Sequence, residues 1–314
     1  MATEPKRIAA IDIGTVTCRL LLAQVENGSL TELERRCSIT DLGIGVDKTG
    51  VLREDAIERV VAKVAEYLQV LEGYRTAQFP EIPVIAMATS ASRDAENADV
   101  LVGKLRALGV ELSVIEGQRE AALSFRGASC GFEGENLMVA DIGGGSTEIV
   151  LGVGGQAPKL AHSFNIGCRR VTERFLASDP PSGEECTEAR QWVRSQFEPF
   201  FAQAKEQGIA IDRILAVAGT ATSVVSVDKQ MVVYDSAEVH GTRVPASTLQ
   251  GIYDRLRALP LEERKQVVGL EPARAGVIVA GMGILLEVLA AAGCESFTVS
   301  ESDILQGIIL GACE

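Results

Sequence analysis

Two glycine-bearing turns carry the residues best suited to bind phosphate. The first spans Asp12–Thr17 and reads DIGTVT, and the second spans Asp141–Glu148 and reads DIGGGSTE. Because glycine has no Cβ, such turns let several backbone N–H groups approach one anion. Three successive glycines exceed what an ordinary hairpin turn needs, which favours phosphate binding at the second turn. The candidate phosphate ligands are Asp12, Gly14, Thr15 and Thr17 in the first turn and Gly143, Gly144, Gly145 and Ser146 in the second.

Two carboxylates flank the second turn on opposite arms of a predicted hairpin. They belong to Asp141 and Glu148. Mg²⁺ prefers oxygen ligands, keeps several of its waters and is often held by only one or two carboxylates. The pair is therefore a candidate site for Mg²⁺, or for Mn²⁺ in its place, where the cation would neutralise phosphate charge.

An arginine follows the first turn inside an apolar strand. Arg19 lies between Cys18 and Leu20, where an unpaired guanidinium is costly to bury. Two interpretations stay open: a structural ion pair, or a clamp whose planar fork binds phosphate oxygens.

Two other loops connect apolar strands to helices, and a helix N-terminus attracts anions. One contains Arg93, which is either a phosphate ligand or a solvated side chain behind a Ser92 helix cap. The other begins with Gly219 and Thr220, which suit contact with a phosphate or nucleotide. A purely structural turn explains Gly219 and Thr220 equally well.

Glu120 lies at the start of a further predicted helix, in the run EGQREA. A carboxylate near metal-bound phosphate can orient and deprotonate an attacking water. A first-turn glutamate is also favoured by the helix dipole alone, so both roles stay open. The chain has no GxxxxGK[ST], GxSxG or HExxH motif. Metal-aided phosphoryl transfer to water is the chemistry that these residues support.

Alternating strands and helices must position these groups. Apolar runs at 8–12 and 18–24 predict a hairpin around the first turn, and the pattern restarts near Leu137 around the second. Apolar periodicity predicts one helix from Asp55 to Gly73 and a longer one over 184–207. Later, Ser247 is expected to cap one helix, and Pro272 to begin another that Gly293 ends. The alternation predicts two α/β domains that face each other across a phosphate-binding cleft.

Composition narrows the classes of partner. The formal net charge of −13 argues against non-specific nucleic-acid binding and against an anionic membrane surface. The seven cysteines show no metal-ligand spacing and are expected to be free thiols in a reducing cytosol. The first residues, MATEPKR, lack the apolar core of a signal peptide, and the apolar run over 275–292 contains Glu287. We therefore expect a cytoplasmic protein without a membrane span.

These motifs, in this order, resemble the exopolyphosphatase/guanosine-pentaphosphate phosphohydrolase (Ppx/GppA) family. The resemblance covers nearly the whole chain through AIDIGTVTCRLLL, ATSASRDAEN, EGQREA, DIGGGSTEIVLG, NIGCRRVTERF, AVAGTATS and PARAGVIVAG. It implies two α/β domains of the actin/Hsp70/sugar-kinase (ribonuclease H-like) fold, covering 1–124 plus about 300–314 and 125–299. It also implies release of a terminal phosphate from polyphosphate or pppGpp, with Mg²⁺ and a possible homodimer. The sequence does not choose between the two substrates.

The resemblance also implies roles for individual residues. Glu120 matches the catalytic glutamate, Arg93 a phosphate-contacting arginine, and Arg19 the basic residue after the first loop. Asp141 and Glu148 match the family's metal loop.

The chain departs from the family pattern at Val16, where a side-chain amide is usual, at Gly276, where an aspartate is usual, and in the acidic segment 300–307. Two alternatives stay open. One is a kinase-like ATPase of the same superfamily, which needs a nucleoside pocket such as one around Gly219 and Thr220, and the other is a non-catalytic sensor of polyphosphate or ppGpp, which the changes at Val16 and Gly276 motivate.

Overall fold

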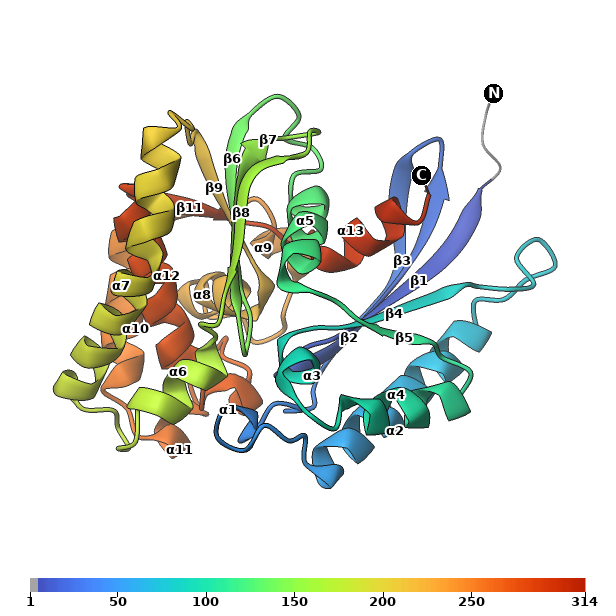
Figure 1. The fold of residues 1–314 in the computed structure, drawn as a ribbon, viewed down its shortest axis with the longest axis horizontal. Coiled ribbons are helices and arrows are strands. Elements are labelled where there is room, and N and C mark those ends of the chain that lie inside the picture. The colour runs from blue at the N-terminus through green and yellow to red at the C-terminus, as the bar shows by residue number, and fades with distance from the viewer. Residues whose placement is uncertain (1–4, 314) are drawn as a thin grey trace. The chain divides into compact units, whose positions relative to one another are not determined.

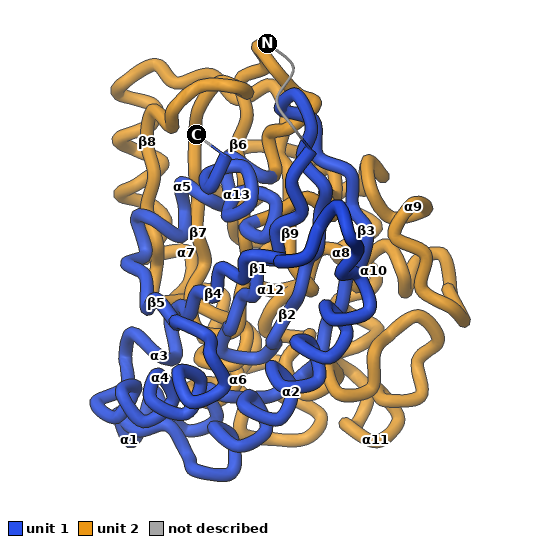
Figure 2. The backbone as a smooth tube through the Cα atoms, turned by 90° about the vertical axis from the view of Figure 1, so that its right-hand side faces the viewer, with its two compact units in different colours: residues 1–127, 304–314 blue, residues 128–303 orange. Residues whose placement is uncertain are grey.

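The chain folds into two compact units. The computed structural model describes residues 5–313. Unit 1 contains the residues up to Gly127 together with those from Ile304 onward, and unit 2 contains Ala128–Asp303 (Figure 2). No helix of the described residues is both long and apolar enough to cross a membrane.

Unit 1 is built on a five-stranded mixed sheet in the order β3-β2-β1-β4-β5. The first three strands form an antiparallel meander, and β4 and β5 continue the sheet in parallel with β1. The strands are β1 (Lys6–Ile13), β2 (Thr17–Glu26), β3 (Ser29–Ile39), β4 (Val84–Ala88) and β5 (Leu112–Val114).

Strand β1 is apolar on both faces because helices cover both sides of the sheet. Ala9 and Ile11 pack with α2 (Glu54–Glu72) and α4 (Ala98–Ala107), whereas Ile8 and Ala10 pack with α13 (Ile304–Gly311) on the other face (Figure 1). Each fully buried Leu or Ile of these clusters stabilises the fold by about 1.5–3 kcal/mol. The sequence therefore shows an unbroken apolar run rather than strict alternation. The remaining helices of the unit are α1 (Val46–Thr49), α3 (Ser90–Asp94) and α5 (Gly117–Ala128).

Unit 2 contains a six-stranded mixed sheet in the order β10-β11-β9-β6-β7-β8. The β6–β7–β8 meander is antiparallel, β9 pairs in parallel with β6 and β11, and β10 pairs antiparallel with β11. The strands are β6 (Asn136–Ile142), β7 (Thr147–Val153), β8 (Pro158–Phe164), β9 (Arg213–Val217), β10 (Arg243–Pro245) and β11 (Ser296–Val299).

Four longer helices supply most of the apolar core of unit 2: α7 (Gly183–Glu206), α8 (Ala218–Asp228), α10 (Ala246–Arg257) and α12 (Ile278–Ala292). Helix α12 is buried almost all round, and its one charged residue, Glu287, is fully buried. Arg190 and Arg194 of α7 bind that carboxylate at 2.6 and 2.7 Å, so the charge is not left uncompensated. Shorter helices are α6 (Cys168–Phe175), α9 (Ser236–Val239), α11 (Leu261–Arg264) and the 3₁₀ turn η1 (Pro272–Arg274).

A capping box explains where the long helix α7 begins. The Ser182 hydroxyl accepts the backbone N–H of Glu185, and the Glu185 carboxylate accepts the N–H of Ser182 in return. Hydrogen bonds from the hydroxyl of Ser178 and the backbone of Ser182 lower the pKa of Glu185 to about 2. The carboxylate therefore remains charged and continues to cap the helix across the neutral range.

The two units repeat one topology. The order β3-β2-β1-β4-β5 in unit 1 corresponds to β8-β7-β6-β9-β11 in unit 2. In each unit a glycine-bearing turn joins the first two strands of the meander, and a parallel strand pairs with the first strand. The two similar motifs in the sequence thus correspond to two units with the same strand order.

Two predicted helix starts are wrong. Helix α10 begins at Ala246 with Pro245 in the capping position, so Ser247 lies inside the first turn. Pro272 begins the separate 3₁₀ turn η1, and the long helix α12 begins only at Ile278. Gly276, a poor helix former, lies in the break between them. The end of α12 at Gly293 is confirmed, where φ is 66° and glycine carries no steric cost.

Candidate active site

The two glycine-bearing turns have the same backbone geometry. In unit 1 the N–H of Gly14 donates to the carbonyl of Thr17 at 2.8 Å, and in unit 2 the N–H of Gly143 donates to the carbonyl of Ser146 at 3.0 Å. A Cβ added to either glycine would lie 3.3 Å from that same carbonyl oxygen. In both turns the first glycine therefore donates the hydrogen bond that closes the turn, and little space is left there for a side chain.

In unit 2, helix α6 fixes the orientation of the turn. The carbonyl of Gly143 accepts the N–H of Cys168, and the carbonyl of Gly144 accepts the N–H of Arg169, both at 2.9 Å. The carbonyl of Gly145 accepts Nε of Arg170 at 2.9 Å. Because a trans peptide points its C=O and N–H in opposite directions, the N–H groups of the residues that follow each glycine point away from α6. These are the N–H groups of Gly144, Gly145 and Ser146, and none of them donates to another described residue.

In unit 1, the segment that follows β3 fixes the orientation of the first turn. The N–H of Gly43 donates to the carbonyl of Thr15 at 2.8 Å, and the N–H groups of Thr40 and Asp41 donate to the carbonyl of Val16 at 2.9 Å. The N–H groups of Val16 and Thr17 consequently point away from that segment. Each unit therefore presents a set of convergent backbone donors of the kind that binds anions.

The next-to-last residue of the first strand faces a different partner in each unit. Asp12 lies directly opposite Arg19 across β1 and β2, and Arg19 binds it through Nε at 3.0 Å and Nη2 at 2.6 Å. Asp141 lies directly opposite Glu148 across β6 and β7. Unit 1 thus neutralises its acidic side chain with a guanidinium, whereas unit 2 places two carboxylates at the corresponding positions.

Both carboxylates of unit 2 are buried, with 7% of Asp141 and 1% of Glu148 exposed. Like charges directly opposite each other in a sheet are destabilising. The Ser163 hydroxyl on β8 donates to Oε1 of Glu148 at 2.6 Å, which fixes the direction of that carboxylate. The described residues contain no group of three or more His, Cys, Asp or Glu side chains placed to hold a metal. The donor set is therefore a pair of hard oxygen ligands, which suits Mg²⁺.

Arg93 and Glu120 come together in unit 1. Arg93 lies on α3 directly after β4, and Glu120 lies in the first turn of α5 directly after β5. Because β4 and β5 are parallel neighbours, their carboxyl ends share one edge of the sheet. Nη1 of Arg93 donates to Oε2 of Glu120 at 3.1 Å and to the carbonyl of Ile115 at 3.0 Å. The helix-cap alternative is wrong for Ser92, because it lies within α3 and Thr89 holds the capping position.

Gly219 and Thr220 lie in the first turn of α8. A Cβ added to Gly219 would lie 1.5 Å from Nη1 of Arg274, so the guanidinium of η1 packs directly on this glycine. Thr220 is buried against Gly281 of α12. The preceding Ala218 has φ 64°, a left-handed conformation that costs a non-glycine residue about 1–2 kcal/mol. Such strain is commonly stored at functional sites.

Sequence inspection missed Arg274 and Gly167. Arg274 is a lone basic residue in the apolar run PARAGVIVAG, and only the fold brings it to Gly219. Gly167 precedes α6, and a Cβ there would lie 2.2 Å from the carbonyl oxygen of Gly144. The glycine permits α6 to approach the phosphate turn, although its own φ of −130° needs no glycine. A glycine two residues before a pair of arginines was the available signal.

The two buried cysteines near the turns are not candidate nucleophiles. Cys168 begins α6 beside the turn, and burial raises the pKa of its thiol. Burial likewise raises the pKa of Cys18 on β2. Both thiols therefore stay protonated at neutral pH and are poor nucleophiles.

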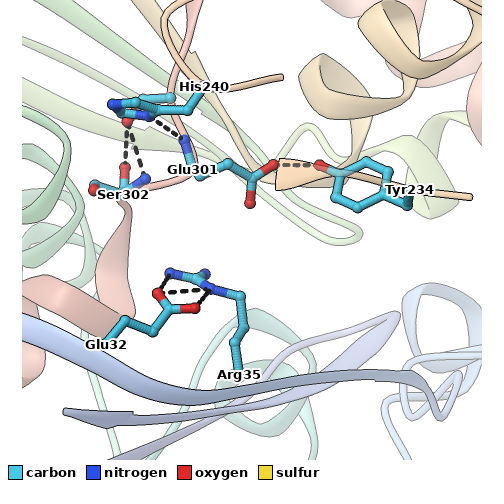
Figure 3. Close-up of polar contacts among 7 residues, drawn as sticks. Glu32, Arg35, Tyr234, His240, Glu301 and Ser302 are labelled. Atoms are coloured by element: carbon cyan, nitrogen blue, oxygen red, sulfur yellow. Dashed lines mark hydrogen bonds and ion pairs between the residues drawn. The ribbon is translucent and has the colours of Figure 1, made fainter. Parts of the chain in front are cut away.

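The acidic late segment is held by hydrogen bonds in unit 2. The Tyr234 hydroxyl donates to the Glu301 carboxylate, and the N–H of Glu301 donates to Nδ1 of His240 at 3.1 Å (Figure 3). Burial raises the pKa of Tyr234, so the phenol stays a donor. Figure 3 also shows Glu32 and Arg35 of β3, an exposed pair in unit 1 that contributes little to stability.

The structure places a glycine-bearing turn at the same point of the same strand topology in each unit. The chain belongs to the Ppx/GppA phosphatase family, whose sequence model matches residues 21–314. The recognition of that family from the sequence motifs is confirmed.

Named relatives span almost the whole chain. Exopolyphosphatase 2 of Mycobacterium tuberculosis is 39% identical to this chain, and the match covers 97% of this chain and 98% of that protein. A bifunctional 3-dehydroquinate synthase/phosphatase of Fusobacterium nucleatum is 36% identical over 98% of this chain, but over only 46% of its own length.

A crystal structure of the Aquifex aeolicus member of the Ppx/GppA family has the same fold. It superposes with a TM-score of 0.81 and 30% identity, covering 98% of both chains. The predicted α/β class is confirmed, and the chain divides into two compact units as expected.

Proposed function

We propose that this protein is an exopolyphosphatase, a hydrolase that releases the terminal orthophosphate of inorganic polyphosphate. The observation that carries the proposal is found in each unit separately: a neighbouring segment binds the carbonyl groups of the glycine-bearing turn, so that the N–H groups of the turn point away from that segment. A polyanion with many equivalent phosphates matches two such donor sets. The name of the 39%-identical Mycobacterium tuberculosis relative supports the same substrate.

In this proposal unit 1 supplies the base. Glu120 accepts a proton from the attacking water and directs it at the terminal phosphorus. The remaining polyphosphate leaves as the P–O bond to the bridging oxygen breaks, and the displaced oxygen carries the charge of the departing chain. Arg93 and the N–H groups of the first turn stabilise charge on the transferred phosphoryl group, as preorganised donors do in phosphoryl transfer.

Unit 2 supplies the cation site. Asp141 and Glu148 would hold Mg²⁺, or Mn²⁺ in its place, because two buried carboxylates directly opposite each other fit a divalent ion that takes oxygen ligands. The ion, when bound, neutralises phosphate charge. The glycine turn beside these carboxylates binds phosphate oxygens through backbone N–H groups, and Ser163 keeps the Glu148 carboxylate oriented.

A substrate panel tests the proposal. Orthophosphate release is measured from long polyphosphate, a short polyphosphate, pppGpp and ATP, each with Mg²⁺ and with excess chelator. We expect metal-dependent release from polyphosphate at a kcat of at least 1 s⁻¹, the low end for ordinary enzymes.

The other outcomes separate the alternatives. Release from pppGpp alone would assign the enzyme to the nucleotide rather than to polyphosphate. Transfer of phosphate from ATP to an acceptor, without polyphosphate hydrolysis, would identify a kinase-like enzyme. Tight binding of polyphosphate without turnover in either Mg²⁺ or Mn²⁺ would identify a sensor, and any of these three results contradicts the proposal.

A further inference from the structure

His240 accepts a hydrogen bond that a protonated imidazole could not accept. The backbone N–H of Glu301 donates to its Nδ1 at 3.1 Å (Figure 3). A neutral imidazole has one nitrogen that accepts and one that donates, whereas both nitrogens of an imidazolium donate. The contact therefore requires an unprotonated Nδ1, and with it the tautomer that carries its hydrogen on Nε2.

This hydrogen bond holds the segment 300–303, which is the last part of unit 2 before the chain returns to unit 1. The segment begins with a backbone contact, because the N–H of Ser300 donates to the carbonyl of Ala216 in β9 at 3.0 Å. At the next residue a side chain takes over the role of the backbone acceptor, since the N–H of Glu301 is bound by the imidazole of His240. One titratable group thus supports the backbone of the segment.

The segment is bonded to the strand that leads into candidate phosphate ligands of unit 2. Ser300 binds β9 two residues before Ala218, whose φ of 64° is left-handed. Gly219 and Thr220 follow directly in the first turn of α8. A change in the position of the segment therefore acts on the junction between β9 and α8.

The elements around His240 carry several charged or titratable groups. They are Lys229 at the end of α8, paired with Glu238 of α9 at 3.0 Å; Asp235 before α9; Arg243 of β10, whose Nε donates to Ser296 at 2.9 Å; Tyr234, whose hydroxyl donates to the carboxylate of Glu301; and Asp303. Of these side-chain types, only histidine normally changes its charge between about pH 5 and 8. His240 is exposed, so its imidazole exchanges protons with solvent.

We propose that His240 is a pH-sensitive latch on the segment 300–303. While Nδ1 is unprotonated, the N–H of Glu301 is bound and the segment keeps its place beside β9. A proton taken from solvent occupies Nδ1, so the acceptor is lost and the N–H of Glu301 hydrogen-bonds to water instead. Acidification thereby loosens the start of α8 and weakens phosphate binding there. Only this last step rests on the proposed function.

Amide hydrogen exchange, measured by NMR and expressed as protection relative to the unfolded chain, tests the latch at about pH 7.5 and about pH 5.5, on either side of the usual histidine pKa. The proteins are the wild type, His240→Asn and His162→Asn. In His240→Asn the side-chain oxygen takes the place of Nδ1 but does not titrate. His162, the only other histidine of the chain, is exposed on β8 and serves as the matched control.

We expect the protection of the Glu301 N–H to fall about tenfold at the lower pH in the wild type and in His162→Asn, as loss of one hydrogen bond implies. In His240→Asn the same N–H should keep its protection. Unchanged protection in the wild type, or an equal fall in His240→Asn, would overturn the proposal.

Two further measurements separate the latch from its effect on activity. A scalar coupling across the hydrogen bond, between the amide nitrogen of Glu301 and Nδ1 of His240, should be present at the higher pH and absent at the lower; its absence at both would contradict the neutral acceptor. Over the same interval the KM for long polyphosphate should rise at least about twofold more in the wild type than in His240→Asn, as when half of the molecules leave the binding-competent state. An equal rise in both would overturn the effect on phosphate binding. An inactive wild type would refute the proposed function, and the exchange result would still decide on the latch.

Discussion

At the scale of single residues, the two units differ in the residue that pairs with the aspartate before the glycine-bearing turn. Asp12 and Asp141 are the next-to-last residues of corresponding strands, yet the residue directly opposite is Arg19 in unit 1 and Glu148 in unit 2. The 2.6 Å bond between Arg19 and Asp12 gives unit 1 an internal cation. Unit 2 instead has a second carboxylate at the corresponding position, so the pair of oxygen ligands proposed for the metal lies in unit 2.

Ser163 provides a test of the proposed cation site that does not alter a ligand. Removing its hydroxyl in Ser163→Ala leaves Glu148 without the 2.6 Å hydrogen bond that orients it. Loss of such an outer-shell partner typically weakens metal binding about 10- to 100-fold. We expect a rise of that size in the Mn²⁺ dissociation constant measured by electron paramagnetic resonance, and in the Mg²⁺ concentration that gives half-maximal phosphate release.

The control for this measurement is Ser195→Ala, which removes an exposed hydroxyl from α7 in the same unit. It should leave both metal constants unchanged. Unaltered Mn²⁺ binding in Ser163→Ala would show that Glu148 does not depend on the serine for its orientation, or that it is not a ligand.

Residue types near the turns could be predicted from the sequence, but their partners could not. An arginine in an apolar strand indicated either an ion pair or a phosphate clamp, and the fold supplies the ion pair with Asp12. The contact of Arg274 with Gly219 joins segments more than fifty residues apart. No local pattern encodes such a contact, because it depends on how η1 and α8 pack.

At the scale of elements, each glycine-bearing turn is braced by the chain that follows the third strand of its meander. The brace is the segment around Thr40–Gly43 in unit 1 and the start of α6 in unit 2. Both braces bind the carbonyl groups of the turn and thereby direct its N–H groups the other way. The direction of these N–H groups therefore depends on two packed elements rather than on the glycine motif by itself.

Gly167→Ala tests the brace in unit 2. The new Cβ would lie 2.2 Å from the carbonyl oxygen of Gly144, so α6 and the turn must move apart. Overpacking of this kind costs about 1–3 kcal/mol of unfolding free energy, measured by urea denaturation. We expect kcat/KM for polyphosphate to fall at least about tenfold as well, since each 1.4 kcal/mol of lost transition-state stabilisation is tenfold in rate.

Gly251→Ala is the matched control, because Gly251 lies on the exposed side of α10 with open space around its Cβ position. That change should stabilise the helix by about 0.5–1 kcal/mol and leave kinetics unchanged. Wild-type stability and kinetics in Gly167→Ala would show that α6 does not hold the turn.

The starts and ends of helices could be predicted from the sequence where the local signals pointed to the same residue. The apolar periodicity over 55–73 predicts α2 well, because the apolar face it identifies is the one that α2 buries. Gly293 predicts the end of α12, because the chain adopts a left-handed conformation there. The start of α12 could not be predicted, since Pro272 favours a helix start but Gly276 interrupts the helix before Ile278. At α10 the fixed φ of Pro245 already supplies the extended entry that Ser247 was expected to provide.

At the scale of the whole molecule, one topology is used twice with different chemistry in each copy. Unit 1 carries the candidate base and two of the candidate phosphate-binding arginines, and unit 2 carries the carboxylate pair. A net charge of −13 also means that the local donors must bind a polyanion against an unfavourable overall field.

Orthophosphate release from long polyphosphate with Mg²⁺, compared between Glu120→Gln and Glu116→Gln, tests the central claim most directly. Both variants lose one carboxylate from the same segment, but Glu116 is exposed whereas Glu120 is buried beside Arg93. A general base typically contributes about 10²–10⁴-fold to the rate. The account predicts a loss of that size in kcat for Glu120→Gln, with the fold intact, and no more than a twofold change for Glu116→Gln. Wild-type phosphate release by Glu120→Gln would contradict it.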